Sequence, residues 1–525
     1  MKKKVFGAKF RVGLLAAGVA LIFGFLFFLR FYDLTLDSFS YDDYGTSWFD
    51  EGYIHNARNM ALFGSWTLEG DLWNPMYISP VYTVLEFISF SIFGVSTFSM
   101  RLVPALLGAL SIILAGLLFM LKKSREALVY SLLLGGNIML FSFGRIAMIE
   151  SVLLFFIILS LGLINYNSKC SWIATGFFIP FLFFSKITSI FFILAIPISL
   201  LGYYWIYRSK ETIKNLVWLI SGSIASAFLW MLWLIPNLDS WKYANFAGYG
   251  SRVEFGLVKI ISSFLFFLKF SLLNQLIIFF SLLAVLACLF VFFKKKRIPF
   301  MDFLIIVSIA LFLLQITFAD YPLRRFLLVV PIILLATTRF ICSINKITLI
   351  FTESRMKVSS NRFITIFLAV YLFINLAYMG VYFSPLASGW DNNHVIASAS
   401  EKVGEYIPPG EKVYGYYAVS FAAENKIKPY YSRSNIDFAN TEEVIMPMLK
   451  SGEINYAVME ANLSDFESSK KKNADVGGSL VYTYVKDNFE VIGVINIKDT
   501  RYNYPGDKIY VYKRKNCSID SICRI

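Results

Sequence analysis

Long apolar runs are the feature that most limits what this chain can fold into. The run from Val12 to Leu29 holds 18 residues without a strongly polar side chain, enough for a helix to cross about 30 Å of hydrocarbon. Two stretches, 80–94 and 257–270, are apolar but short or interrupted, which is typical of interfacial or re-entrant segments. Ten further runs are predicted to span a membrane: 100–121, 126–144, 147–165, 171–185, 187–206, 215–235, 272–293, 301–318, 326–343 and 363–383.

Composition supports the same interpretation. The 525 residues are 57% hydrophobic and only 16% charged, whereas soluble domains carry about 25% charged residues. The sequence therefore predicts a mostly α-helical, polytopic membrane bundle of about 11 spans. It excludes one large soluble enzyme, a disordered chain, a collagen-like chain and a disulfide scaffold.

Charge orients this predicted bundle. Five basic residues precede the first run, and no small-residue cleavage site follows it, so we expect a retained helix and not a signal peptide. With the N-terminus inside, every predicted cytoplasmic segment is basic, as the positive-inside rule requires. The first outer loop, 31–79, holds eight acids and one base, Arg58. The prediction is a cytoplasmic (inner) membrane protein with a cytoplasmic N-terminus and its C-terminus outside.

The tail, 384–525, differs in composition from the rest of the chain. It holds 17 Lys and Arg against 18 Asp and Glu, a net charge of −1, so the preceding residues carry +15 of the total of +14. The basic balance thus reflects membrane topology and predicts no nucleic-acid partner. We expect two domains, a transmembrane module over 1–383 and an extracytoplasmic α/β domain over 384–525. The tail is predicted to contain a helix at 401–407, strands at 412–418, 456–459, 481–485, 489–497 and 509–512, and a loop at 468–478.

The segment Phe49–Gly64 is the sharpest local feature of the outer loop. Asp50 and Glu51 suit the start of a short helix, where carboxylates meet the positive end of the helix dipole. Gly64 is placed to cap its end. The pattern fits two interpretations: a capped helix whose apolar face lies on the membrane surface, or a pair of catalytic carboxylates.

Ionisable residues at membrane depth form a second group. Arg145, Glu150 and Lys186 lie at the outer ends of predicted spans, where charged groups are costly and often functional. A structural ion pair, or a lysine reaching to the interface, would also explain them. The topology brings them to the same face as Asp50, Glu51, Arg324 and Arg325. Basic side chains there could hold the phosphate of a lipid, and a carboxylate could take a proton from an attacking hydroxyl.

Several cofactor motifs are missing from the sequence. It has no Walker loop, no dinucleotide glycine fingerprint and no Cys/His metal cluster. The energy for any transfer must therefore arrive in the substrate. No cofactor is predicted with certainty, although a carboxylate pair could hold a divalent cation through oxygen ligands; no metal ligands are assigned.

A series of motifs follows in order over residues 13–210: Asp50-Glu51 with Tyr53, Arg58 and Gly64-Ser65-Trp66; Pro80-Val81-Tyr82; Phe93-Gly94; Ser99 to Leu106; Gly144-Arg145 to Glu150; and Ser185-Lys186. In these motifs the chain resembles the multi-pass glycosyltransferases of family 39, which have the GT-C fold and include the dolichyl-phosphate-mannose protein mannosyltransferases and the bacterial lipid A aminoarabinose transferases.

The resemblance implies transfer of a sugar from a polyprenyl-phosphate carrier to an acceptor hydroxyl on the outer face, with inversion. Asp50 would be the general base, with Glu51 beside it and Glu150 as a third catalytic residue. Glu150 stands where the family usually has Asp, and the lipid A transferases carry a lysine that Tyr77-Ile78-Ser79-Pro80 lacks. The donor and its phosphate are then assigned to six residues: Tyr53, Arg58, Arg145, Lys186, Arg324 and Arg325.

The partners implied are the polyprenyl-phosphate sugar donor, a lipid, glycan or protein acceptor, and membrane lipids. A transporter or flippase of lipid-linked sugars is the main alternative, but it predicts internal repeats that the sequence lacks. A sensor with an outer ligand domain would explain the tail and not Arg145 or Glu150.

Overall fold

The structure is a computed structural model of the chain. It describes residues 18, 20–36, 50–71, 74–121, 124–246, 298–318, 326–351, 360–383, 394–415, 418–419, 421–430, 441–459, 480–496 and 508–515. The predicted span 272–293, the segment 257–270 and the loop 468–478 lie outside these residues.

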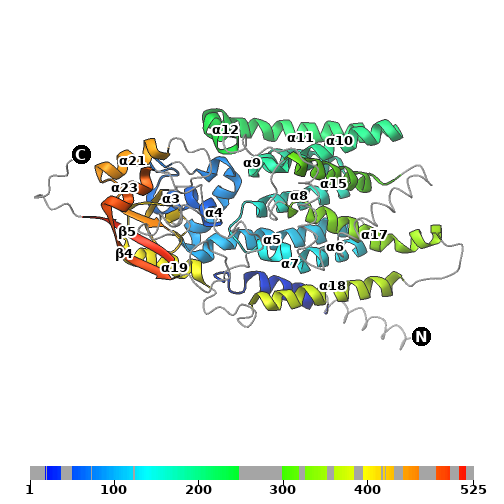
Figure 1. Cartoon of the computed structure of the whole chain (residues 1–525). Helices are drawn as coiled ribbons and strands as arrows, with labels where there is room; N and C mark the ends of the chain where they lie inside the picture. Colours follow the sequence, from blue (N-terminus) through cyan, green and yellow to red (C-terminus); the bar gives the residue numbers. More distant parts are fainter. Residues whose placement is uncertain are drawn as a thin grey trace, which may run out of the picture.

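The described part is a helical bundle with a small sheet at one end (Figure 1). Its first helix is Ala20–Phe31. The other bundle helices are α5 (Thr97–Met120), α6 (Ser124–Gly136), α7 (Ile138–Phe143), α8 (Glu150–Tyr166), α9 (Lys169–Ser185), α10 (Ile190–Tyr207), α11 (Lys210–Leu234), α15 (Phe300–Phe318), α17 (Val330–Phe351) and α18 (Ser360–Phe383).

Three helices in the described ranges are long and apolar enough to cross a membrane: Thr97–Met120, Ile187–Tyr207 and Lys210–Phe246. Other apolar helices, such as Glu150–Tyr166 and Lys169–Ser185, are shorter. These helices support a membrane location, and the total of about 11 spans stays a prediction.

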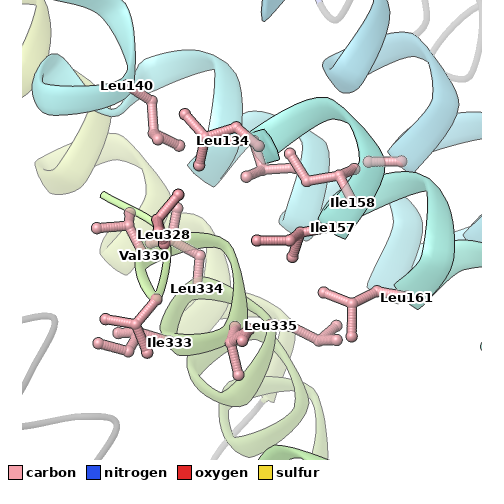
Figure 2. Packing of buried hydrophobic residues seen from close by; sticks show 14 of the residues in the cluster. Leu134, Leu140, Ile157, Ile158, Leu161, Leu328, Val330, Ile333, Leu334 and Leu335 are labelled. Atoms are coloured by element: carbon pink, nitrogen blue, oxygen red, sulfur yellow. The ribbon is translucent and has the colours of Figure 1, made fainter. Parts of the chain in front are cut away.

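The bundle core lies where α8 and α17 face each other. Figure 2 shows Ile157, Ile158 and Leu161 of α8 close to Leu334 and Leu335 of α17. All five side chains are almost fully buried. Because the surrounding helices are apolar all round, packing and not amphipathicity decides which face meets which neighbour.

The predicted span 126–144 is wrong as one helix, since the structure breaks it into α6 and α7 at Asn137. The Asn137 side chain accepts a hydrogen bond from the Leu140 amide at 3.0 Å and so caps α7. The freed amide of Ile138 donates to Asn375 of α18, also at 3.0 Å. Side chains of a neighbouring helix thus satisfy the backbone groups that the break leaves, as membrane helices require.

The tail carries a five-stranded mixed sheet in the order β2-β1-β3-β5-β4. Its strands are β1 (Lys412–Tyr414), β2 (Lys428–Tyr430), β3 (Tyr456–Met459), β4 (Phe489–Asn496) and β5 (Lys508–Arg514). β1 pairs in parallel with β2 and β3, and β5 pairs antiparallel with β3 and β4. One face packs on α19 (Val395–Tyr406), and the other packs on α21 (Thr441–Ser451) and α23 (Leu480–Asn488).

The predicted strand 481–485 is wrong, because these residues form α23. Val and Tyr favour a strand there, but Val481 and Val485 are four residues apart and both fully buried. That spacing places them on one helix face, which packs against Ala457 and Tyr512 of the sheet. Burial of this face overrides the local preference.

The tail and the bundle share one hydrophobic core. Four further short elements occupy the junction: α2 (Asp50–Tyr53), α3 (His55–Phe63), η2 (Pro75–Tyr77) and α4 (Pro80–Phe93). Ile54, Phe90 and Ala147 from this end of the bundle pack in the same cluster as Val403 and Val511 of the tail. The tail therefore packs on residues that lie next to the predicted catalytic ones, with Ile54 just after α2 and Ala147 just before α8.

Candidate functional site

The predicted carboxylate pair lies at the start of α2. Asp50 and Glu51 are the first two residues of this helix, as the sequence predicts; their side chains lie outside the described part. Tyr53, at the end of α2, is buried within the bundle core. Gly64 ends α3 in the left-handed conformation, with φ of 71°, and its amide donates to Met60 at 3.1 Å. The predicted cap is confirmed.

The membrane-surface interpretation of this helix is wrong. Ile54 and Ala57, on the apolar face of the predicted helix, are buried against the tail. The first half of α3 is therefore enclosed between bundle and sheet, including its polar residues His55, Asn56, Arg58 and Asn59, whereas the residues from Met60 to Phe63 are half-buried.

Two of these buried residues organise the loop that follows α3. The Nε2 atom of His55 makes a hydrogen bond with the carboxylate of Asp71. The side-chain amide of Asn56 donates to the carbonyl of Trp66 at 2.8 Å and accepts from the amide of Met76 at 2.9 Å. Sequence reasoning missed both roles, because partners 10 to 20 residues away follow no regular spacing.

Arg58 connects α3 to the tail. Its guanidinium donates to the carbonyls of Ala422, Asn425 and Ile427 at 2.8–3.0 Å. Burial lowers the pKa of Arg58 to about 9, so the side chain remains charged at neutral pH. Arg58 therefore holds the tail by hydrogen bonds to its backbone carbonyls. The contact of Arg58 with a phosphate stays a prediction.

Arg145 closes the end of the first helix. It is 1% exposed and donates to the carbonyls of Leu29, Arg30 and Asp33 at 2.5–3.0 Å. These carbonyls lie at and beyond a helix C-terminus, where cations are favourable. The structural ion pair that the sequence allows is therefore not made by Arg145 within the described residues.

Glu150 instead pairs with Lys186. The Lys186 Nζ lies 2.5 Å from a Glu150 carboxylate oxygen, and both side chains are at most 6% exposed. Glu150 begins α8 and Lys186 follows the last residue of α9. Lys186 thus does not reach out to the interface, and the structure brings together one predicted catalytic acid and one predicted phosphate-binding base.

Arg324 and Arg325 lie outside the described residues. Within the ranges that the structure describes, no three His, Cys, Asp or Glu side chains form a group that could hold a metal ion. The assignment of a divalent cation therefore stays a prediction.

Glu86 is a junction residue that sequence reasoning missed. It lies on α4, whose 14 residues are too few to span hydrocarbon, and it is fully buried. Desolvation raises the pKa of Glu86 well above its usual range, and the Tyr82 hydroxyl offsets only part of this. The signal was a single acid within an apolar run of the sequence. Glu86 is thus a buried acid that favours its neutral form.

The candidate site combines the acids at the start of α2 with buried cations, and the tail covers these groups. Charges in such a setting interact more strongly than in water. In the Glu150–Lys186 pair the ammonium holds a carboxylate. The same ammonium can hold a phosphate in place of that carboxylate.

Comparison with known proteins bears on this interpretation. The family model of dolichyl-phosphate-mannose-protein mannosyltransferase matches residues 20–238, which is less than half of the chain. No curated protein sequence matches the chain.

Three solved structures match the chain. ArnT from Cupriavidus metallidurans, bound to undecaprenyl phosphate, shares 12% identity over 95% of this chain and 98% of its own, with a TM-score of 0.60. The apo form of the same protein gives the same coverage and identity, with a TM-score of 0.61. The Archaeoglobus fulgidus oligosaccharyltransferase tethered to an acceptor peptide shares 13% identity over 85% of this chain and 69% of its own, with a TM-score of 0.49.

The family match and the ArnT fold together confirm the resemblance to GT-C membrane glycosyltransferases of family 39. The matched residues include α2, α3, Arg145, Glu150 and Lys186. The ArnT fold continues through the tail.

Proposed function

We propose that this protein transfers a sugar from a polyprenyl-phosphate carrier to an acceptor hydroxyl on the extracytoplasmic face of the membrane. The observation that carries the proposal is the ArnT fold over 95% of the chain, in a relative solved with undecaprenyl phosphate. The match to the mannosyltransferase family over 20–238 supports the same chemistry.

In the proposed reaction, the acceptor oxygen attacks the anomeric carbon of the donor sugar. The bond between that carbon and the phosphate oxygen breaks, the polyprenyl phosphate leaves, and the configuration is inverted. Asp50, at the start of α2, takes the proton of the acceptor hydroxyl. Glu51 lies beside it.

Lys186 is the phosphate-binding residue with the strongest structural support. Its ammonium already holds an oxyanion, the carboxylate of Glu150, in a buried site. The donor phosphate is a diester with one negative charge, like the carboxylate, and the polyprenyl phosphate that leaves is a more highly charged monoester, so the ammonium can exchange the carboxylate for the phosphate as the leaving group forms. Arg324 and Arg325 are proposed as further phosphate partners, and their replacement by alanine should raise the KM for the donor.

The test uses purified protein in lipid with a panel of radiolabelled polyprenyl-phosphate sugars and crude envelope acceptors. Wild type should consume one donor, and Asp50→Asn should lose transfer by about 100-fold or more, as expected for removal of a general base. Asp487→Asn, at an exposed tail position, is the matched control and should keep full activity.

Two outcomes would contradict the proposal. Full activity of Asp50→Asn would exclude this carboxylate as the base. Intact donor appearing in the opposite leaflet, without transfer, would favour the transporter alternative. Consumption of one donor by wild type would also identify the sugar.

A further inference from the structure

The chain bends between α9 and α10 at the proposed phosphate-binding residue, Lys186. α9 ends at Ser185, Lys186 has an extended backbone with φ of −172°, and one short turn, η3 (Ile187–Ser189), leads into α10. The Lys186 side chain therefore extends from a bend and not from the side of a regular helix. The bend sets the direction of this side chain, whose Nζ lies 2.5 Å from a carboxylate oxygen of Glu150 at the start of α8.

Two side chains satisfy backbone carbonyls at this bend. The Ser189 hydroxyl donates to the carbonyl of Leu182, in the last turn of α9, at 2.9 Å. The Gln315 amide, from α15, donates to the carbonyl of Thr188 at 3.2 Å. Lipid offers no hydrogen bonds to the backbone groups that a helix break frees, so these two bonds stabilise the bend. They tie η3 to the end of α9 on one side and to α15 on the other.

Gln315 is suited to this contact by its place in α15. It stands in the apolar second half of the helix, where an amide is costly unless it is hydrogen-bonded. Ser308 of the same helix bonds within its own helix, to the Leu304 carbonyl at 2.7 Å. Gln315 instead reaches across to η3. Because its partner there is main chain, the bond fixes the backbone two residues after Lys186.

We propose that Ser189 and Gln315 are positioning residues for the lipid phosphate of the donor. By holding η3, they keep the Lys186 ammonium in place when the phosphate replaces the Glu150 carboxylate. The inference rests on the proposed function, in which Lys186 binds this phosphate. A lysine on a loosely held bend would have to be ordered at each binding event, and that loss of conformational freedom would weaken binding.

The test measures binding of undecaprenyl phosphate to the full-length protein in detergent by native mass spectrometry, and so does not depend on turnover. Ser189→Ala and Gln315→Leu should each raise the Kd by about 3- to 10-fold, the effect expected when one hydrogen bond is lost. Ser189→Thr keeps a hydroxyl and should bind as wild type does. Thr188→Val is the matched control in η3, since its hydroxyl has no hydrogen-bond partner among the described residues and its carbonyl is unchanged.

A second background shows whether these residues act through Lys186. Lys186→Met combined with Glu150→Gln removes both charges of the buried pair, so that neither is left unpaired. In this background, adding Ser189→Ala or Gln315→Leu should change the Kd by less than about twofold, because no ammonium remains to be positioned. A merely structural role would weaken binding by the same factor in both backgrounds.

An unchanged Kd in both Ser189→Ala and Gln315→Leu would overturn the positioning role, since the bend would then need neither bond. A Kd raised equally in Thr188→Val, or equally in the background without Lys186, would also overturn it and would indicate a general loss of packing. Sugar transfer by wild type together with unchanged Kd values would remove the positioning role alone. The expected Kd values without transfer from any donor would support the positioning role and remove the proposed glycosyltransferase activity.

Discussion

At the scale of single residues, Glu86 ties the stability of the junction to pH. Its raised pKa means that the folded protein keeps a proton there which the unfolded chain releases above about pH 4.5. Between these two pKa values the unfolded state binds fewer protons, so stability falls as pH rises, by up to about 1.4 kcal/mol per pH unit.

Glu86→Gln removes this ionisation and keeps a similar shape. At pH 8 we expect the variant to be more stable than wild type, by on the order of 1–3 kcal/mol in the free energy of unfolding, and to melt at a higher temperature. This difference in stability should shrink toward pH 5. Thermal unfolding in detergent across this range is the measurement. A difference that stays constant with pH would mean that Glu86 does not titrate in this window.

Arg58 is predicted to act through the tail. Arg58→Ala leaves the carbonyls of Ala422, Asn425 and Ile427 without their donor, and a buried acceptor left without a donor costs about 1–3 kcal/mol. The tail should then become more sensitive to protease. Lys428→Ala is the control, since Lys428 only lies over the Phe63 ring at 5.2 Å.

The opposite result would restore the phosphate role of Arg58. If Arg58→Ala kept wild-type stability and protease resistance but raised the donor KM, its guanidinium would bind donor and not the tail. Stability and donor KM, measured together, therefore distinguish the observed contacts with the tail from the phosphate binding that the resemblance predicts.

At the scale of elements, the crossing of α9 and α11 depends on two glycines. A Cβ added at Gly176 would lie 2.0 Å from the Leu219 carbonyl oxygen, and one at Gly222 would lie 2.0 Å from that of Ile173. Backbones this close need residues without side chains, as in other membrane helix pairs. The Ser223 hydroxyl adds a hydrogen bond to the Gly176 carbonyl at 3.1 Å.

Gly176→Ala or Gly222→Ala should force these helices apart and lower the free energy of unfolding by about 1–3 kcal/mol or more. Gly380→Ala on α18 is the control, because an added Cβ there meets nothing within 4 Å and alanine favours a helix. Thermal unfolding of the three variants tests this. Equal melting temperatures would show that α9 and α11 separate at little cost.

At the scale of the whole molecule, sequence patterns predicted the helices and strands whose formation depends on local composition. The helices at 171–185 and 301–318 begin within two residues of α9 and α15, and the strand 456–459 matches β3. β2 was missed because it is short and contains Pro429, which sheets accept at an edge. The break at Asn137 was missed because its stabilising partner, Asn375, is distant in sequence.

The sequence pattern brought Glu150 and Lys186 to one end of the bundle and allowed an ion pair there, but it did not show that these two residues pair across 36 positions. Their roles in a catalytic site stay predictions. Arg145 and Arg58 bind backbone carbonyls, which every residue carries and no motif distinguishes. Tertiary packing alone decides such contacts.

The shared core predicts that bundle and tail fold as one unit. A chain ending at residue 383 would expose Ile54, Phe90 and Ala147, which pack on Val403 and Val511 in wild type. It would also lose the Glu424 carboxylate that accepts from the Thr97 amide at 2.5 Å, at the start of α5. Exposed apolar surface of this kind promotes association.

We therefore expect the chain 1–383 to elute from size exclusion in detergent as aggregate, whereas a chain ending at residue 515 should stay monodisperse. The second truncation retains all five strands, since β5 ends at Arg514. A monodisperse 1–383 chain with the melting temperature of wild type would contradict the shared core. Such a result would mean that the tail is a separate domain and that the bundle folds without it. The candidate site could then be studied in the bundle alone.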